Sequence, residues 1–119
     1  MGTSKVLEMI RPFDPSGANA EENYDAVVRR VNRVRSRRAV VSRELTELER
    51  QFVEEDLTVR SGPRRGQPLT RNGRRRRLAR LLELGAEYRQ LNDEERFASS
   101  DLDRMNEALD RWARETYGA

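Results

Sequence analysis

The sequence predicts an all-α protein, in which an antiparallel, coiled-coil-like helical hairpin is followed by a third, C-terminal helix. Three observations predict this fold. Apolar residues recur in alternating steps of three and four from Tyr24 to Phe52, a stretch rich in proline and glycine interrupts the chain at 57–70, and apolar helical stripes resume after it. Of the 119 residues, 35% are hydrophobic and 38% are charged. Long solvated helices with a narrow apolar seam have this composition, whereas a thick core needs more apolar residues.

The first 18 residues are predicted to form an extended N-terminal arm, because Pro12, Pro15 and Gly17 forbid a continuous helix there. Its apolar residues either dock on this chain or a neighbour, or belong to a partly disordered terminus. They are Val6, Leu7, Met9, Ile10 and Phe13. Residues 19–119 are then expected to form one helical domain.

The first helix is predicted over 19–56, beginning at Asn19, and it carries the longest heptad pattern of the chain. One polar residue, Arg38, occupies an apolar heptad position, where it either sets register or oligomeric state or extends to solvent. The helix-packing or oligomerisation seam is predicted to consist of Val27, Val31, Val34, Arg38, Val41, Leu45, Leu48 and Phe52.

The connector at 57–70 contains Ser61-Gly62-Pro63 and Gly66-Gln67-Pro68, which break any helix. Because Leu57 and Val59 alternate with polar residues, a short β-hairpin is an expectation there. A second helix is predicted over 71–96, following Thr70 or Asn72. A third is predicted over 100–117, because Ser100 and Asp103 resemble a helix-capping pair.

Charge is segregated in blocks along the chain, and every basic residue except Lys5 is arginine. Basic blocks at 29–38 and 60–80 alternate with acidic blocks at 44–56 and 83–95. In an antiparallel hairpin, blocks of opposite sign come level with one another. The prediction places Glu54–Asp56 near Arg74–Arg77, Glu47 and Glu49 near Arg80, and 29–38 near Asp93–Glu95. Internal pairing is therefore favoured over two free basic faces.

The connector arginines are predicted to escape this pairing, because they flank glycines and prolines away from the acidic blocks. Backbone amides near Gly62 and Gly66 would add to an anion site. The candidate anion- or nucleic-acid-binding residues are Arg60, Arg64, Arg65, Arg71, Arg74 and Arg75. No helix-turn-helix pattern is visible, so phosphate contacts with little base specificity are expected.

The chain contains no cysteine and no histidine, which excludes disulfides, thiolate chemistry and histidine-based catalysis. It also lacks a phosphate-binding loop, a dinucleotide fingerprint and EF-hand spacing. No catalytic residue, metal site, cofactor or small-molecule substrate is therefore expected. No apolar run approaches the roughly 20 residues that span a bilayer, so a cytoplasmic protein without membrane contact is expected.

These observations favour a non-catalytic assembly or adaptor protein, acting through coiled-coil oligomerisation or contacts with a partner helix. A homo-oligomer or a larger protein assembly is expected, because the predicted core is thin. The alternative is a nucleic-acid-binding protein that makes salt-sensitive phosphate contacts through the connector, for example within a phage or DNA-packaging assembly. The partner, the oligomer number, the choice between DNA and RNA, and whether the first helix pairs within or between chains all stay open.

Overall fold

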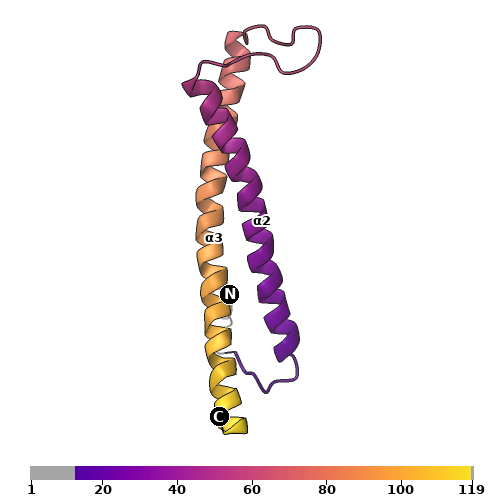
Figure 1. The fold of residues 1–119 in the computed structure, drawn as a ribbon, viewed down its shortest axis with the longest axis vertical. Helices are drawn as coiled ribbons and strands as arrows, with labels where there is room; N and C mark the ends of the chain where they lie inside the picture. The colour runs from indigo at the N-terminus through magenta and orange to yellow at the C-terminus, as the bar shows by residue number, and fades with distance from the viewer. Residues whose placement is uncertain (1–12, 119) are drawn as a thin grey trace, which may run out of the picture. The chain divides into compact units, whose positions relative to one another are not determined.

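The computed structural model describes residues 13–118 and contains two long helices, α2 (Ala20–Val53) and α3 (Arg71–Tyr117), with no strand among those residues (Figure 1). The predicted all-α helical hairpin is confirmed. The apolar residues of the N-terminal arm from Val6 to Ile10 lie outside the described part of the chain. Residues 13–19 lie before α2 and contain turns, including one in which the Ser16 amide and hydroxyl donate to Asp14 Oδ1.

The predicted third helix is wrong, because α3 runs without a break through the proposed boundary at 97–99. This stretch, Phe97-Ala98-Ser99, holds no proline or glycine, and Ala98 is completely buried. Ser100 resembles a capping residue, but inside α3 its hydroxyl accepts a hydrogen bond from Arg104 Nη2 at 3.4 Å. A residue suited to a cap does not start a new helix when nothing ends the preceding one.

The helices contribute to two compact units, one comprising Arg33–Glu95 and the other comprising, among the described residues, 13–32 and 96–118. In the Arg33–Glu95 unit, the two apolar stripes meet in a narrow core. Leu84 and Val41 are fully buried at its centre. The core consists of Val34, Val41, Leu48, Leu84 and Leu91, with Leu45, Leu81 and Tyr88 packed against it. Apolar seam residues of α2 in this unit therefore pack against α3 of the same chain.

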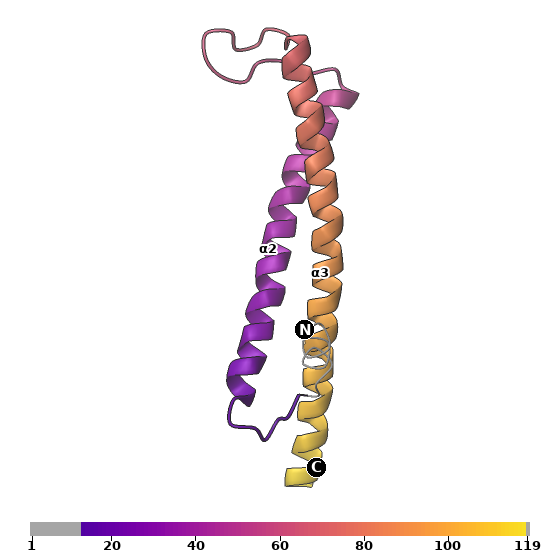
Figure 2. The ribbon, with the colours of Figure 1, turned by 180° about the vertical axis from the view of Figure 1, so that it is seen from behind.

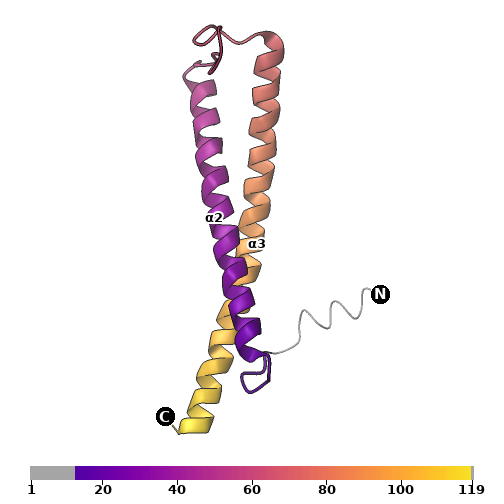
Figure 3. The ribbon, with the colours of Figure 1, turned by 90° about the vertical axis from the view of Figure 1, so that its right-hand side faces the viewer.

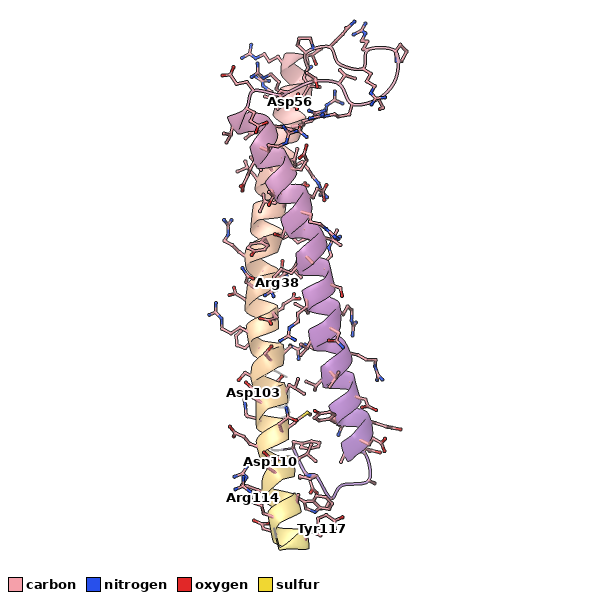
Figure 4. All side chains as sticks on the ribbon, in the orientation of Figure 1. Arg38, Asp56, Asp103, Asp110, Arg114 and Tyr117 are labelled. Atoms are coloured by element: carbon pink, nitrogen blue, oxygen red, sulfur yellow. The ribbon has the colours of Figure 1, made fainter. Side chains whose placement is uncertain are left out.

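Arg38 lies on the face between the two helices in this unit (Figure 4). Its Nη1 donates to Asn92 Oδ1 at 3.3 Å and lies 3.3 Å from Glu95 Oε2. The side chain is 30% exposed, so it is only partly buried. Arg38 therefore has polar partners on α3 of the same chain, and its role in register or oligomeric state stays a prediction.

In the other unit, Val31 is 2% exposed and Val27 is half-buried, while Ala98 of α3 is buried as well. Two polar contacts join α2 to α3 there. The Tyr24 hydroxyl donates to Asn106 Oδ1 at 2.9 Å, and Arg30 pairs with Asp101 at 3.5 Å.

The first helix ends at Val53, three residues before the predicted Asp56. Glu55 adopts a left-handed conformation with φ of 54°. The Asp56 amide donates to the Gln51 carbonyl at 2.8 Å, and the Glu55 amide donates to the Phe52 carbonyl at 3.4 Å. This pair of bonds is the Schellman arrangement that closes a helix C-terminus, usually with glycine in the left-handed position.

The connector between α2 and α3 is an irregular loop, shown from two further sides in Figures 2 and 3. The predicted β-hairpin is not formed, because the connector, residues 57–70, contains an isolated bridge between Thr58 and Pro68 and no strand. Pro68 has no amide hydrogen to extend a ladder. The loop is nevertheless hydrogen-bonded across its base, where Leu69 donates to the Leu57 carbonyl and Val59 donates to the Gln67 carbonyl.

The start of α3 agrees with the prediction. Thr70 precedes the first helical residue, Arg71, and its Oγ1 accepts a hydrogen bond from the Gly73 amide at 3.1 Å. This is the bond that an N-cap threonine makes with the third residue of a helix.

Candidate nucleic-acid interface

Four arginines of the Arg33–Glu95 unit, including Arg38, are paired with acidic residues of the opposite helix. Arg35 contacts Glu95 at 3.0 Å and Arg37 contacts Glu87 at 2.7 Å. The predicted pairing of the first basic block with Asp93–Glu95 is thus confirmed through Glu95. The predicted partners of Arg80 are wrong by about one helical turn, because Arg80 pairs with Glu44 at 3.1 Å instead of Glu47 or Glu49.

The acidic residues at the end of α2 are neutralised locally. Arg50 contacts Glu47 and Glu54 at 2.7 Å each, and it contacts Asp56 at 3.1 Å. The predicted pairing of Glu54–Asp56 with Arg74–Arg77 is therefore wrong. Arg50 lies three or four residues from Glu47 and Glu54, so it reaches them with little chain-ordering cost and outcompetes distant partners.

Arg60 was expected to lie away from the acids, and that expectation is wrong. Its Nη2 lies 3.1 Å from Asp56 Oδ2 and 3.9 Å from Glu47 Oε1. Hydrogen bonds from Arg50 and Gln51, with the nearby charges of Arg50 and Arg60, lower the pKa of Glu47 from 4.5 to about 2. Hydrogen bonds from Arg50 and Arg60 also lower the pKa of Asp56. These acids stay ionised at neutral pH, with guanidinium partners beside them.

Arg77 joins three segments at the same end of the unit. Its Nη1 donates to Gln51 Oε1 at 2.8 Å, and its Nη2 donates to the Thr58 carbonyl at 2.6 Å. Gln51 is only 6% exposed, so this contact satisfies a buried polar group of α2 while it fixes the connector. The sequence reasoning missed this role, although a signal existed: Arg77 lies one heptad before Leu84, on the face of α3 that meets α2.

The remaining arginines of this end form what we call the arginine cluster. All six are exposed, and none makes an ion pair or side-chain hydrogen bond within residues 13–118. Figure 4 shows nitrogen-tipped side chains extending from the connector near Asp56. The arginine cluster consists of Arg64, Arg65, Arg71, Arg74, Arg75 and Arg76. Five of these were candidates from the sequence, and Arg76 was not.

The local sequence gives the arginine cluster no acidic neighbour, since no aspartate or glutamate lies between Leu57 and Leu82. The first turn of α3 also lacks an acidic residue, whereas that of α2 has Glu21 and Glu22. The positive end of the α3 dipole therefore adds to the charge of Arg71 and Arg74. The result is a concentration of positive potential that would attract a phosphate group.

The expected contribution of connector amides to an anion site finds no support around Gly66. The amides of Arg65, Gly66 and Gln67 donate to carbonyls of Gly62, Val59 and Arg64. Gly62 and Gly66 have φ of 83° and 85°, which lets the loop fold back and make these bonds. These three amides therefore order the loop that carries Arg64 and Arg65.

Two other kinds of site have no counterpart in residues 13–118. No group of three or more acidic residues in that range is arranged to hold a metal ion. No helix within it is long and apolar enough to cross a membrane. The large apolar side chains that stay exposed in the Arg33–Glu95 unit include Leu78 and Leu82 of α3, at 46% and 66%.

The fold and this site define the chain as an all-α helical hairpin protein with an exposed arginine cluster where the connector meets α3. Comparison with known proteins matches no protein-family model, no curated protein and no solved structure.

Proposed function

We propose that this protein is a non-catalytic nucleic-acid-binding protein, and that it contacts phosphates through the arginine cluster. The proposal rests on one observation: at one end of the hairpin, some arginines are paired within the described chain and others are not. Arg50 and Arg60 are held by carboxylates, and Arg77 is held by Gln51 and Thr58, whereas the arginine cluster faces solvent without an acid. Arginine forks match phosphate oxygens bidentately, so a phosphate backbone suits these side chains.

The arginine cluster is also unfavourable to the free protein. Positive side chains at a helix N-terminus oppose the dipole, typically by about 0.3–1 kcal/mol each in the first turn. Crowding six like charges without a counter-charge adds repulsion. A sequence optimised for folding alone would carry aspartate or glutamate in the first turn, as α2 does with Glu21 and Glu22. A bound polyanion would convert this cost into a favourable interaction.

Two variants with equal charge change test the proposal. In the cluster variant, the six arginines of the arginine cluster are changed to glutamine, which has a similar helix propensity. In the control variant, the same change is made at six exposed arginines that have no ion pair or side-chain hydrogen bond within the described residues. The control positions are Arg29, Arg33, Arg43, Arg89, Arg111 and Arg114. Each variant lowers the net charge by six from the +3 of the whole chain.

Binding to labelled nucleic acid is measured by fluorescence anisotropy between about 50 and 200 mM salt, where counterion release makes phosphate binding strongly salt-dependent. We expect the wild type to bind with an affinity that falls steeply with salt. The cluster variant should lose most of that binding, and the control variant should keep most of it. Equal loss in both variants would show that net charge alone controls binding, and the proposal would then be rejected.

A second candidate function is the assembly or adaptor role, for which Leu78 and Leu82 are the supporting observation. Apolar seam residues in the Arg33–Glu95 unit pack within the chain, so they support no second coiled-coil partner. The exposed Leu78 and Leu82 lie four residues apart on α3, where they suit packing against a second copy. Sedimentation over a range of concentrations tests this role, which predicts a dimer or larger species that Leu78→Lys with Leu82→Lys converts to monomer. A monomer throughout would exclude self-assembly through this face.

A further inference from the structure

The segment that carries the arginine cluster contains no aromatic residue. No phenylalanine, tyrosine or tryptophan occurs from Val53 to Glu87. The aromatic residues that flank this stretch are engaged in packing, since Phe52 is half-buried and Tyr88 packs against the core. The site therefore offers charge and hydrogen-bond donors but no aromatic platform on which a base could stack.

Proteins that bind single strands without sequence preference combine a basic surface with aromatic residues, and stacking contributes about 1–3 kcal/mol per base. A duplex hides its bases and presents phosphates at a higher linear density, so charge alone supplies most of its binding. The same number of phosphate contacts releases more counterions from a duplex than from a single strand. Charge without stacking thus favours the duplex.

The support under the arginine cluster is also ordered before any ligand binds. Three hydrogen bonds from backbone amides close the loop around Gly66. Thr70 caps α3, and Arg77 links the connector to Gln51. A preformed set of donors loses little entropy when it meets a stiff duplex. A flexible strand must be ordered on binding, and at this site no stacking would offset that cost.

From these observations we infer that the arginine cluster binds the phosphate backbone of double-stranded nucleic acid in preference to single strands. This inference rests on the proposed function and specifies its ligand. Contacts are made from arginine guanidinium groups to phosphate oxygens, and the base sequence has little influence. With at most six arginines involved, the slope of log affinity against log salt should not exceed about 5 for a duplex, at about 0.9 per phosphate contact.

The test uses the full chain and three labelled probes: a mixed-sequence DNA duplex of two helical turns, and each of its separated strands. Affinity is measured by anisotropy at several salt concentrations, for the wild type, the cluster variant and the control variant. We expect the duplex to bind the wild type at least about tenfold more tightly than either strand, with the salt slope given above. A second duplex of unrelated sequence should bind within about twofold of the first.

The outcomes separate the inference from the proposed function. Equal or tighter binding of the strands, lost in the cluster variant, would overturn the duplex preference and leave nucleic-acid binding through the arginine cluster intact. Binding of no probe, or equal loss in the cluster and control variants, would overturn both. A strong preference between the two duplexes would overturn the inference of backbone recognition, because it would require contacts to base edges.

Discussion

Arg77 of α3 donates a 2.8 Å hydrogen bond from Nη1 to Oε1 of Gln51, a buried polar side chain of α2. The same guanidinium donates to the Thr58 carbonyl, so one side chain links the end of α2, the connector and the start of α3. Its neighbour in the sequence, Arg76, is exposed and has no such contact within the described residues. Of these two adjacent arginines, Arg77 makes contacts within the described hairpin and Arg76 does not. Arg76 is therefore a suitable control for mutation of Arg77.

Arg77→Leu is expected to lower the free energy of unfolding by about 1–3 kcal/mol, because Gln51 Oε1 and the Thr58 carbonyl would lose their donor. Urea unfolding followed by circular dichroism measures the change. Adding Gln51→Leu should recover part of it, since an unpaired buried amide is then removed. Arg76→Leu is the control and should change stability by no more than about 0.5 kcal/mol. Equal losses for the two arginines would show that the Gln51 contact does not stabilise the fold.

Asn72→Asp would place a carboxylate in the first turn of α3, where no acidic residue now lies. We expect it to raise the free energy of unfolding by about 0.3–1 kcal/mol through the helix dipole and the neighbouring arginines. The same change should weaken nucleic-acid binding, because the new charge competes with phosphate. Thermal unfolding and anisotropy are measured together, with Asn72→Gln as the uncharged control. A variant that is both more stable and tighter in binding would argue against phosphate contact near this turn.

The pKa of Glu47 predicts how stability depends on pH. Its pKa is lowered from 4.5 to about 2 in the folded protein, so the unfolded state binds a proton first as the pH falls. The stabilisation from Glu47 is present above pH 4.5 and is lost between about 4.5 and 2. Glu47→Gln should therefore flatten the acid limb of the stability curve, measured by urea unfolding from pH 7 to 2. Glu49→Gln is the control, because Glu49 makes no ion pair within residues 13–118. An unchanged acid limb in Glu47→Gln would contradict the assignment.

Two leucines two positions apart on α3 test the seam. Leu84 is completely buried in the core, whereas Leu82 is 66% exposed. Leu84→Ala should lower the free energy of unfolding by about 2–5 kcal/mol, the usual cost of deleting a buried leucine. Leu82→Ala should change it by about 0.5 kcal/mol or less in the monomer. A large loss for Leu82→Ala that grows with protein concentration would instead indicate that Leu82 is buried between copies.

Much of the hairpin could be predicted because helix periodicity and helix-breaking residues can be recognised from short stretches of sequence. Val41 and Leu84 occupy the centre of stripes that the heptad spacing defines, and Thr70 has a sequence that suits an N-cap. The continuity of α3 was missed because Ser100 looks like a cap, and only the burial of Ala98 shows that the helix has a reason to continue. Local capping preferences amount to about 1 kcal/mol, which tertiary packing easily exceeds.

The sequence predicted where the candidate site lies, but it did not predict all of the residues that form it. The lack of acidic residues near the connector predicted unpaired arginines there. Arg64 and Arg65 are indeed exposed without acidic partners in the described chain. Composition could not show that Arg60 turns back toward Asp56 or that Arg77 points into the hairpin. Those outcomes depend on where the helix ends and how the loop returns, since a left-handed Glu55 directs the chain at that point. Pairing therefore depends on the local backbone conformation, which charge blocks do not encode.

The missing acidic charge at the start of α3 has a dynamic consequence. The first turn holds Arg71 and Asn72, whose amides have no backbone acceptor within the described residues, and like charges surround them. We expect the amides of Arg71 and Asn72 to exchange with solvent fastest among those of α3, because they lack an acceptor. Phosphate bound there would supply the counter-charge and slow the exchange. Ligand binding would then be measurable as slower exchange of these two amides, while the Thr70 cap and the hydrogen bonds around Gly66 hold the donors in place without a ligand.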